Sequence, residues 1–77
     1  MSAKELEKRL AEAFALAEVE VKDLTGGGDH FAATIVSAAF VGKPLIQRHR
    51  MVYAALGDAM KGDIHALALT TRTPDEP

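Results

Sequence analysis

The N-terminal segment carries apolar residues at the spacing of an α-helix. Leu6, Leu10 and Phe14 recur every four residues, and charged residues cover the opposite face. Ser2, followed by Glu5 three residues later, matches a capping box and marks the start of the helix. The pattern predicts an amphipathic helix that needs a sheet or another helix against its apolar face.

The pattern then changes to a period of two, which is typical of strands. In residues 18–23 valines alternate with charged residues, as expected of a strand with one face in water. A glycine-rich connection, residues 25–30, separates this strand from a second apolar stretch, residues 31–37. Together the two stretches predict a β-hairpin whose loop is longer than a tight turn.

A break at Gly42–Pro44 precedes a second segment with helical spacing. Proline is tolerated in the first turn of a helix, so we expect this helix to begin there. His49 and Val52 lie on its apolar stripe, which continues to Met60, and Gly62 is a suitable residue to end it.

Residues 64–69 are almost continuously apolar and predict a third strand covered on one or both faces. The polar tail, residues 70–77, has two prolines among its last four residues, and we expect it to fray. The element order is then α-β-β-α-β. This order makes residues 1–77 a single α/β (α+β) domain, with a three-stranded mixed sheet packed on its helices. A strand-helix-strand unit normally joins parallel strands by a right-handed crossover.

This topology places two histidines at one edge of the sheet. His30 lies just before the second strand and His65 near the start of the third, and the N-terminal ends of parallel strands share an edge. Neutral imidazole is the commonest protein metal ligand, and two imidazoles make half of a four-coordinate site. Two interpretations are open: a pair of ligands that another molecule completes, or a polar loop residue and a partly exposed strand residue.

Composition narrows the possible partners and the compartment. Nine Lys and Arg stand against eleven Asp and Glu, so the formal net charge of -2 gives no general attraction to nucleic acid or to anionic membranes. The absence of cysteine removes thiolate ligands and thiol nucleophiles, and it fits a reducing cytosol. We find no signal peptide or membrane-spanning run, and we expect a cytoplasmic protein with no membrane partner.

The sequence lacks the parts of an enzyme active site. Ser2 is a helix cap, and Ser37 ends a strand without an evident histidine–acid pair. Gly26–Gly28 opens a strand rather than a helix, and it lacks the Lys-Ser/Thr of a phosphate-binding loop. We therefore expect a protein that binds a partner, with no catalytic residues and no small-molecule substrate.

A basic cluster at the start of the second helix indicates a docking surface. Lys43, Arg48 and Arg50 have the charge to contact phosphates from one helix, but three cations on an acidic protein make a weak nucleic-acid footprint. A solvated face, or a docking surface for an acidic partner, is the simpler interpretation. We interpret His49, on the apolar stripe, as a packing residue rather than a ligand.

Several segments together resemble the BolA family, also called stress-induced morphogens. The main signature is residues 36–50, Val-Ser-Ala-Ala-Phe-Val-Gly-Lys-Pro-Leu-Ile-Gln-Arg-His-Arg. The resemblance extends back to Asp23, the glycine loop and His30-Phe31, and forward to residues 64–67, Ile-His-Ala-Leu, and to Thr73-Pro74. It covers essentially the whole chain and implies a core similar to a type II KH domain. KH domains clamp RNA with a Gly-x-x-Gly loop, which this sequence lacks, so we do not expect RNA binding by that route.

The resemblance also implies a partner and a cofactor. BolA-like proteins bind monothiol glutaredoxins and share with them a bridging [2Fe-2S] cluster, whose cysteine ligands come from the glutaredoxin and from glutathione. The BolA side contributes the histidine of the Ile-His-Ala segment, which is His65 here, and a Cys or His of the first hairpin loop, which matches His30. The resemblance thus implies a role in iron–sulfur cluster assembly or trafficking, or in iron regulation, with no cluster in the isolated chain.

Two hypotheses follow for the basic cluster. In the first, Lys43, Arg48 and Arg50 dock the glutaredoxin or the carboxylates of its glutathione. In the second, the chain resembles those BolA-like proteins that are described as DNA-binding transcription regulators of stress response and cell morphology, acting through the second helix. The net charge of -2 favours the first hypothesis.

Overall fold

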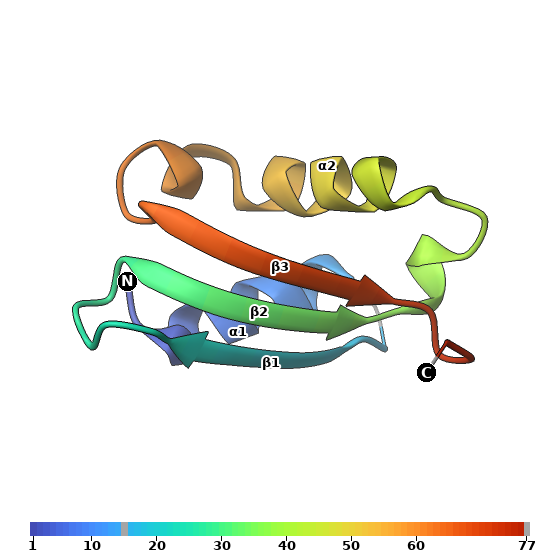
Figure 1. The fold of residues 1–77 in the computed structure, drawn as a ribbon, viewed down its shortest axis with the longest axis horizontal. Helices are drawn as coiled ribbons and strands as arrows, with labels where there is room; N and C mark the ends of the chain where they lie inside the picture. The colour runs from blue at the N-terminus through green and yellow to red at the C-terminus, as the bar shows by residue number, and fades with distance from the viewer. Residues whose placement is uncertain (15, 77) are drawn as a thin grey trace.

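One mixed sheet and two α-helices dominate the computed structural model, which describes residues 1–14 and 16–76 (Figure 1). The elements are α1 (Ala3–Ala13), β1 (Glu18–Asp23), β2 (His30–Val36), the 3-10 helix η1 (Ala38–Phe40), α2 (Leu45–Leu56), the 3-10 helix η2 (Gly57–Lys61) and β3 (Ala66–Arg72). β2 is the central strand, because it pairs antiparallel with β1 and parallel with β3. The predicted α-β-β-α-β order and mixed sheet are confirmed. None of the described helices is long and apolar enough to cross a membrane.

The side chains of β2 alternate between the core and the open face of the sheet. Phe31, Ala33 and Ile35 are buried, whereas the residues between them are only half-buried. The alternation continues into the neighbouring strands, because Phe31 pairs with Leu67 of β3 and Ala33 pairs with Val21 of β1. The register of the central strand therefore decides which side chains of the sheet face the helices.

The core lies between the sheet and the helices, with α1 behind the sheet in Figure 1. Leu6 and Leu10 of α1 are fully buried, as the helical spacing predicted, and Val52 of α2 belongs to the same cluster. Phe14, just beyond α1, packs on Phe40 of η1 with 5.3 Å between the ring centroids. Burial of such large apolar side chains is the dominant favourable term in folding a short chain.

Both helices begin close to their predicted starts, but the second helix ends earlier than predicted. Ser2 caps α1 through its side-chain oxygen. Pro44 is the N-cap of α2 instead of a residue of its first turn. α2 ends at Leu56 because Gly57 adopts a φ of +53°, and the chain continues as the separate helix η2 before it reaches Gly62.

The third strand lies further along the chain than the predicted residues 64–69. β3 begins at Ala66 and ends at Arg72. Ile64 is buried ahead of the strand, and its N–H donates to the Ala59 carbonyl oxygen at 2.9 Å. The apolar side chain of Ile64 therefore packs in the core although the residue belongs to a loop. A run of apolar residues does not by itself distinguish a buried loop residue from a strand residue.

The described part of the polar tail, which we expected to fray over residues 70–77, is bonded to the rest of the protein. Residues 70–72 complete β3. Beyond the strand, Glu76 Oε1 accepts the N–H of Thr73 at 2.6 Å and pairs with Arg48 Nη1 at 2.7 Å. The pattern of the tail does not show these bonds, because Arg48 lies on α2, far away along the chain. Pro77 lies outside the described residues.

Leu16, in the connection from α1 to β1, has a backbone conformation that suits glycine. Its φ is +60°, in the left-handed region, and its side chain is fully exposed. This conformation costs an L-residue about 1 kcal/mol or more, and an exposed side chain gains no burial to offset the cost.

We expect Leu16→Gly to raise the free energy of unfolding by about 0.5–1 kcal/mol, because glycine tolerates positive φ although it gains more freedom when unfolded. Urea denaturation followed by circular dichroism measures this change. Leu24→Gly is the matched control, since Leu24 is also exposed but has no positive φ, and it should lower the free energy of unfolding. Equal effects of the two substitutions would contradict strain at Leu16.

Candidate functional site

Two histidines lie side by side where β2 and β3 begin. His30 opens β2 and pairs with Ala66, the first residue of β3, and His65 immediately precedes Ala66. The two imidazole rings are nearly parallel, with an interplanar angle of 7° and 6.0 Å between their centroids. The parallel pairing of β2 and β3 brings the rings together, so the predicted shared edge is confirmed.

The histidine pair is open to solvent, and Asp29 supports one of its rings. His65 is exposed, and the side chain of His30 is 43% exposed. His30 Nδ1 lies 2.9 Å from Asp29 Oδ1, whereas the His65 ring has no hydrogen-bond partner among the described residues. The hydrogen bond with His30 is the main cause that lowers the pKa of Asp29 from its ordinary value. The pair is therefore accessible to a second molecule.

The loop between β1 and β2 is closed by the side chain of Asp23. Its carboxylate oxygens accept the N–H groups of Thr25, Gly26 and Gly28 at 3.2, 2.9 and 2.9 Å. Gly28 has a φ of +75°, and a Cβ atom there would lie 2.6 Å from the Met1 carbonyl oxygen, so the position requires glycine. The glycine-rich sequence predicted a long hairpin loop but not the role of this carboxylate in closing it. The available signal was an aspartate just ahead of a glycine run, which favours such a turn.

The pair supplies half of the ligands that a four-coordinate metal centre needs. Imidazole nitrogen binds zinc and iron, and two histidines replace two cysteines on one iron of some [2Fe-2S] clusters. Within residues 1–14 and 16–76, no group of three or more His, Cys, Asp or Glu is placed to hold a metal ion. The third histidine, His49, is half-buried on α2, in agreement with a packing role. The donor set therefore fits a cluster whose other ligands come from a second molecule.

The three basic residues predicted to dock a partner differ in accessibility. The Arg48 side chain is only 12% exposed. Its Nε donates to the Lys43 carbonyl oxygen at 2.8 Å, and its Nη1 pairs with Glu76 Oε1 at 2.7 Å. Lys43 is half-buried, and Arg50 is exposed. Arg48 is thus committed to contacts within the protein, and Arg50 is the most accessible cation of the three.

Lys43 and the start of α2 lie at the opposite end of the sheet from the histidine pair. β2 begins with His30 and has 7 residues, which at about 3.3 Å per residue place its far end roughly 20 Å away. The segment that contains Lys43 follows that far end, opposite the β1–β2 loop in Figure 1. The structure therefore keeps the predicted ligands apart from the start of the basic cluster.

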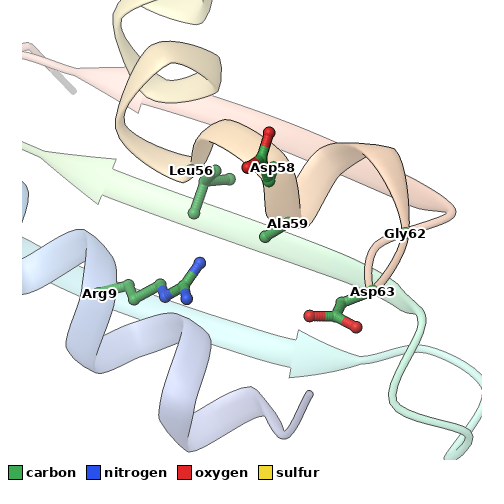
Figure 2. Close-up of a pocket in the computed structure, with 6 residues that line it drawn as sticks. All are labelled: Arg9, Leu56, Asp58, Ala59, Gly62 and Asp63. Carbon is green, nitrogen blue, oxygen red and sulfur yellow. The ribbon is translucent and has the colours of Figure 1, made fainter.

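A separate hollow lies on the helical side of the sheet (Figure 2). It has a volume of about 420 Å³ and lies between α1 and η2, where the side chains of Arg9 and Asp63 project from opposite walls. Its lining contains neither His30 nor His65, so it is distinct from the histidine pair. The lining residues are Arg9, Leu56, Asp58, Ala59, Gly62 and Asp63.

Residues 10–76 match the family of BolA-like proteins, and the chain therefore belongs to this family. Human BolA-like protein 2 is 41% identical over 78 residues, which cover 99% of this chain and 90% of that protein. SufE-like protein 1, chloroplastic/mitochondrial, from Arabidopsis thaliana is 48% identical over 50 residues, which cover 65% of this chain. The matched part is 14% of SufE-like protein 1, 36% of bovine BolA-like protein 1 and 53% of human BolA-like protein 1.

Solved structures of BolA domains confirm the fold. The BolA domain of SufE1 from Arabidopsis thaliana is 36% identical to this chain, with a TM-score of 0.89 over 97% of this chain and 94% of that one. The solution structure of yeast Fra2 is 29% identical, with a TM-score of 0.80 over 95% of this chain and 80% of that one. The predicted α+β class with a three-stranded mixed sheet is thus the architecture of this family.

The contacts of Glu76 predict that the attachment of the tail to the rest of the protein depends on pH. The hydrogen bond from the Thr73 N–H is the main cause that lowers the pKa of Glu76, and Arg48 lowers it further. A carboxylate with a lowered folded-state pKa stabilises the fold above its unfolded pKa of about 4.3, and this contribution is lost as the pH falls through the folded value. An NMR pH titration of the Thr73 amide should therefore show a midpoint below about 4.3.

Arg48→Gln is the control for this titration. It should raise the midpoint only in part, because the larger cause, the Thr73 N–H bond, remains. A wild-type midpoint at or above about 4.3 would show that the tail carboxylate is not held in solution.

Proposed function

We propose that this chain is a non-enzymatic partner of a monothiol glutaredoxin, and that it holds a [2Fe-2S] cluster jointly with that protein through His30 and His65. The process is iron–sulfur cluster assembly or trafficking, or iron regulation, and the cytoplasm is the proposed location. The exposed, side-by-side histidine pair carries the proposal. Membership of the BolA-like family and the similarity to yeast Fra2 and to the BolA domain of SufE1 are consistent with it.

The chemistry of the pair explains why a partner is needed and what this chain adds. The chain has no cysteine, so the thiolate ligands come from the glutaredoxin and from glutathione. When bound, the shared cluster supplies an iron centre that accepts electrons and is transferable. Imidazole in place of thiolate raises the reduction potential and makes binding depend on protonation of the ligands. Both properties suit transfer or sensing more than permanent storage.

The position of the histidines decides which surface the glutaredoxin covers. A partner that supplies the thiolates must cover the end of the sheet where His30 and His65 lie, because cluster ligands are in direct contact with iron. Lys43 follows the far end of β2, which is roughly 20 Å from the histidine pair, and this separation argues against a bond to glutathione carboxylates at the cluster. The basic cluster contributes to glutaredoxin binding only where the partner extends along α2.

Anaerobic [2Fe-2S] reconstitution with a monothiol glutaredoxin and glutathione tests the proposal. We expect the visible circular dichroism spectrum to differ from that of the glutaredoxin homodimer. His65→Ala and His30→Ala should each lose this heterodimer spectrum, because each removes one ligand nitrogen. His49→Gln removes the third histidine and should keep the spectrum, with folding verified by far-ultraviolet circular dichroism.

Two outcomes would reject the proposal. The first is that the wild-type chain leaves the spectrum of the glutaredoxin unchanged, because such a result excludes a shared cluster. The second is that both His65→Ala and His30→Ala keep the heterodimer spectrum, because the cluster is then ligated by other groups.

DNA binding through α2 is the alternative function, and the structure weakens its electrostatic basis. Arg48 is paired with Glu76, which removes one of the three cations from phosphate contact. Leu45 and Ile46, beside the remaining cations, are exposed, and apolar surface of this kind suits a protein partner more than a phosphate backbone.

Salt dependence separates the two functions. If α2 binds DNA, the affinity for duplex DNA falls steeply between about 50 and 200 mM salt, is lost in Arg50→Glu, and is unchanged in His65→Ala. We expect fluorescence anisotropy to show no such salt-dependent binding by the wild-type chain. Tight binding that Arg50→Glu abolishes would establish the DNA function and make the basic cluster its site.

A further inference from the structure

Asp29 contacts both histidines of the pair through different atoms. Its carboxylate Oδ1 lies 2.9 Å from His30 Nδ1. Its carbonyl oxygen accepts the backbone N–H of His65 at 2.8 Å and that of Ala66 at 3.3 Å. One residue therefore connects the ring of His30 to the segment that carries His65.

The carboxylate bond decides which nitrogen of His30 carries the proton. An ionised carboxylate only accepts hydrogen bonds, so Nδ1 of His30 is the protonated nitrogen in this contact. In the neutral ring the other nitrogen, Nε2, then has a free lone pair. A neutral imidazole in water favours the opposite tautomer, with the proton on Nε2. Asp29 thus selects the form in which Nε2 is able to bind a metal.

The two rings of the pair are supported unequally. His30 is held by Asp29 on one side and is followed by Phe31, which is fully buried in the core. Thr25 Oγ1 in turn donates to Asp29 Oδ1 at 3.3 Å, which ties the carboxylate to its own loop. The His65 ring has no hydrogen-bond partner among the described residues. The pair therefore combines one hydrogen-bonded ring with one that contacts it only by stacking among the described residues.

We infer that Asp29 is a positioning residue of the histidine pair, which holds His30 as the Nδ1–H tautomer and reserves Nε2 as the ligand atom. The inference rests on the proposed function of the pair as ligands. Loss of a carboxylate that orients a metal-binding histidine typically lowers metal affinity about 10–100-fold. His65 would supply the second ligand nitrogen without such support from a carboxylate among the described residues.

The test measures the tautomer of each histidine in the free chain. Long-range proton–nitrogen NMR of labelled protein, above the titration range of histidine, should show His30 as Nδ1–H. In Asp29→Ala the ratio of the Nδ1–H to the Nε2–H tautomer of His30 should fall about tenfold or more, because a hydrogen bond to a charged group is lost. Asp29→Asn keeps an accepting oxygen without the charge and should give an intermediate ratio.

Two controls separate this effect from a general disturbance of the fold. The His65 ratio, read from the same spectra, should not change in Asp29→Ala, because its ring does not bond to the carboxylate. Asp63→Asn removes another exposed aspartate, which precedes His65 by two residues in the chain, and it should leave His30 unchanged. The inference is overturned if His30 is the Nε2–H tautomer in the wild type, or if Asp29→Ala leaves its ratio unchanged.

A second measurement links the tautomer to the cluster. In the reconstituted complex with glutaredoxin and glutathione, Asp29→Ala should shorten the lifetime of the cluster about tenfold. An altered tautomer with an unchanged lifetime would overturn the positioning role and leave the proposed function intact. The absence of any wild-type heterodimer spectrum would instead reject the proposed function, whatever the tautomer of His30.

Discussion

The parallel pairing of β2 with β3 is the constraint on which the candidate site depends. Its register aligns His30 with Ala66, so the two strands begin together and His65 stands beside His30. The core maintains this register, because a slip of one residue would turn Phe31 out of the core and His30 into it. Hydrophobic burial and the geometry of the histidine pair are thus two results of the same strand alignment.

Single carboxylates hold the segments that lie outside the sheet and the helices. Asp23 closes the loop between β1 and β2 by accepting three backbone N–H groups, and Asp29 connects that loop to the histidine pair. Glu76 holds the tail in the same manner, through the Thr73 N–H and Arg48. A chain this short has few apolar side chains to spare for its loops, so hydrogen bonds to charged groups order the backbone where the core does not reach.

The two ends of the molecule differ in chemistry. The end with the histidine pair presents open imidazoles on an ordered loop, which suits a partner that brings further ligands. The other end presents the exposed side chains of Val41 and Ile46, and there Arg48 is paired with Glu76. The proposed sharing of a cluster involves only the first end.

The sequence by itself determined the order of the elements, the bounds of β1 and the meeting of His30 with His65. These features follow from local periodicity and from the general parallel crossover, neither of which needs distant contacts. Only the tertiary structure decided how long α2 and β3 are, that Arg48 pairs with Glu76, and that Asp29 contacts His30. A hydrogen bond forms between groups that folding brings within about 3 Å, and the pattern of apolar and polar residues does not encode that distance. For this reason the sequence located the two histidines, and only the fold showed which polar residues contact them.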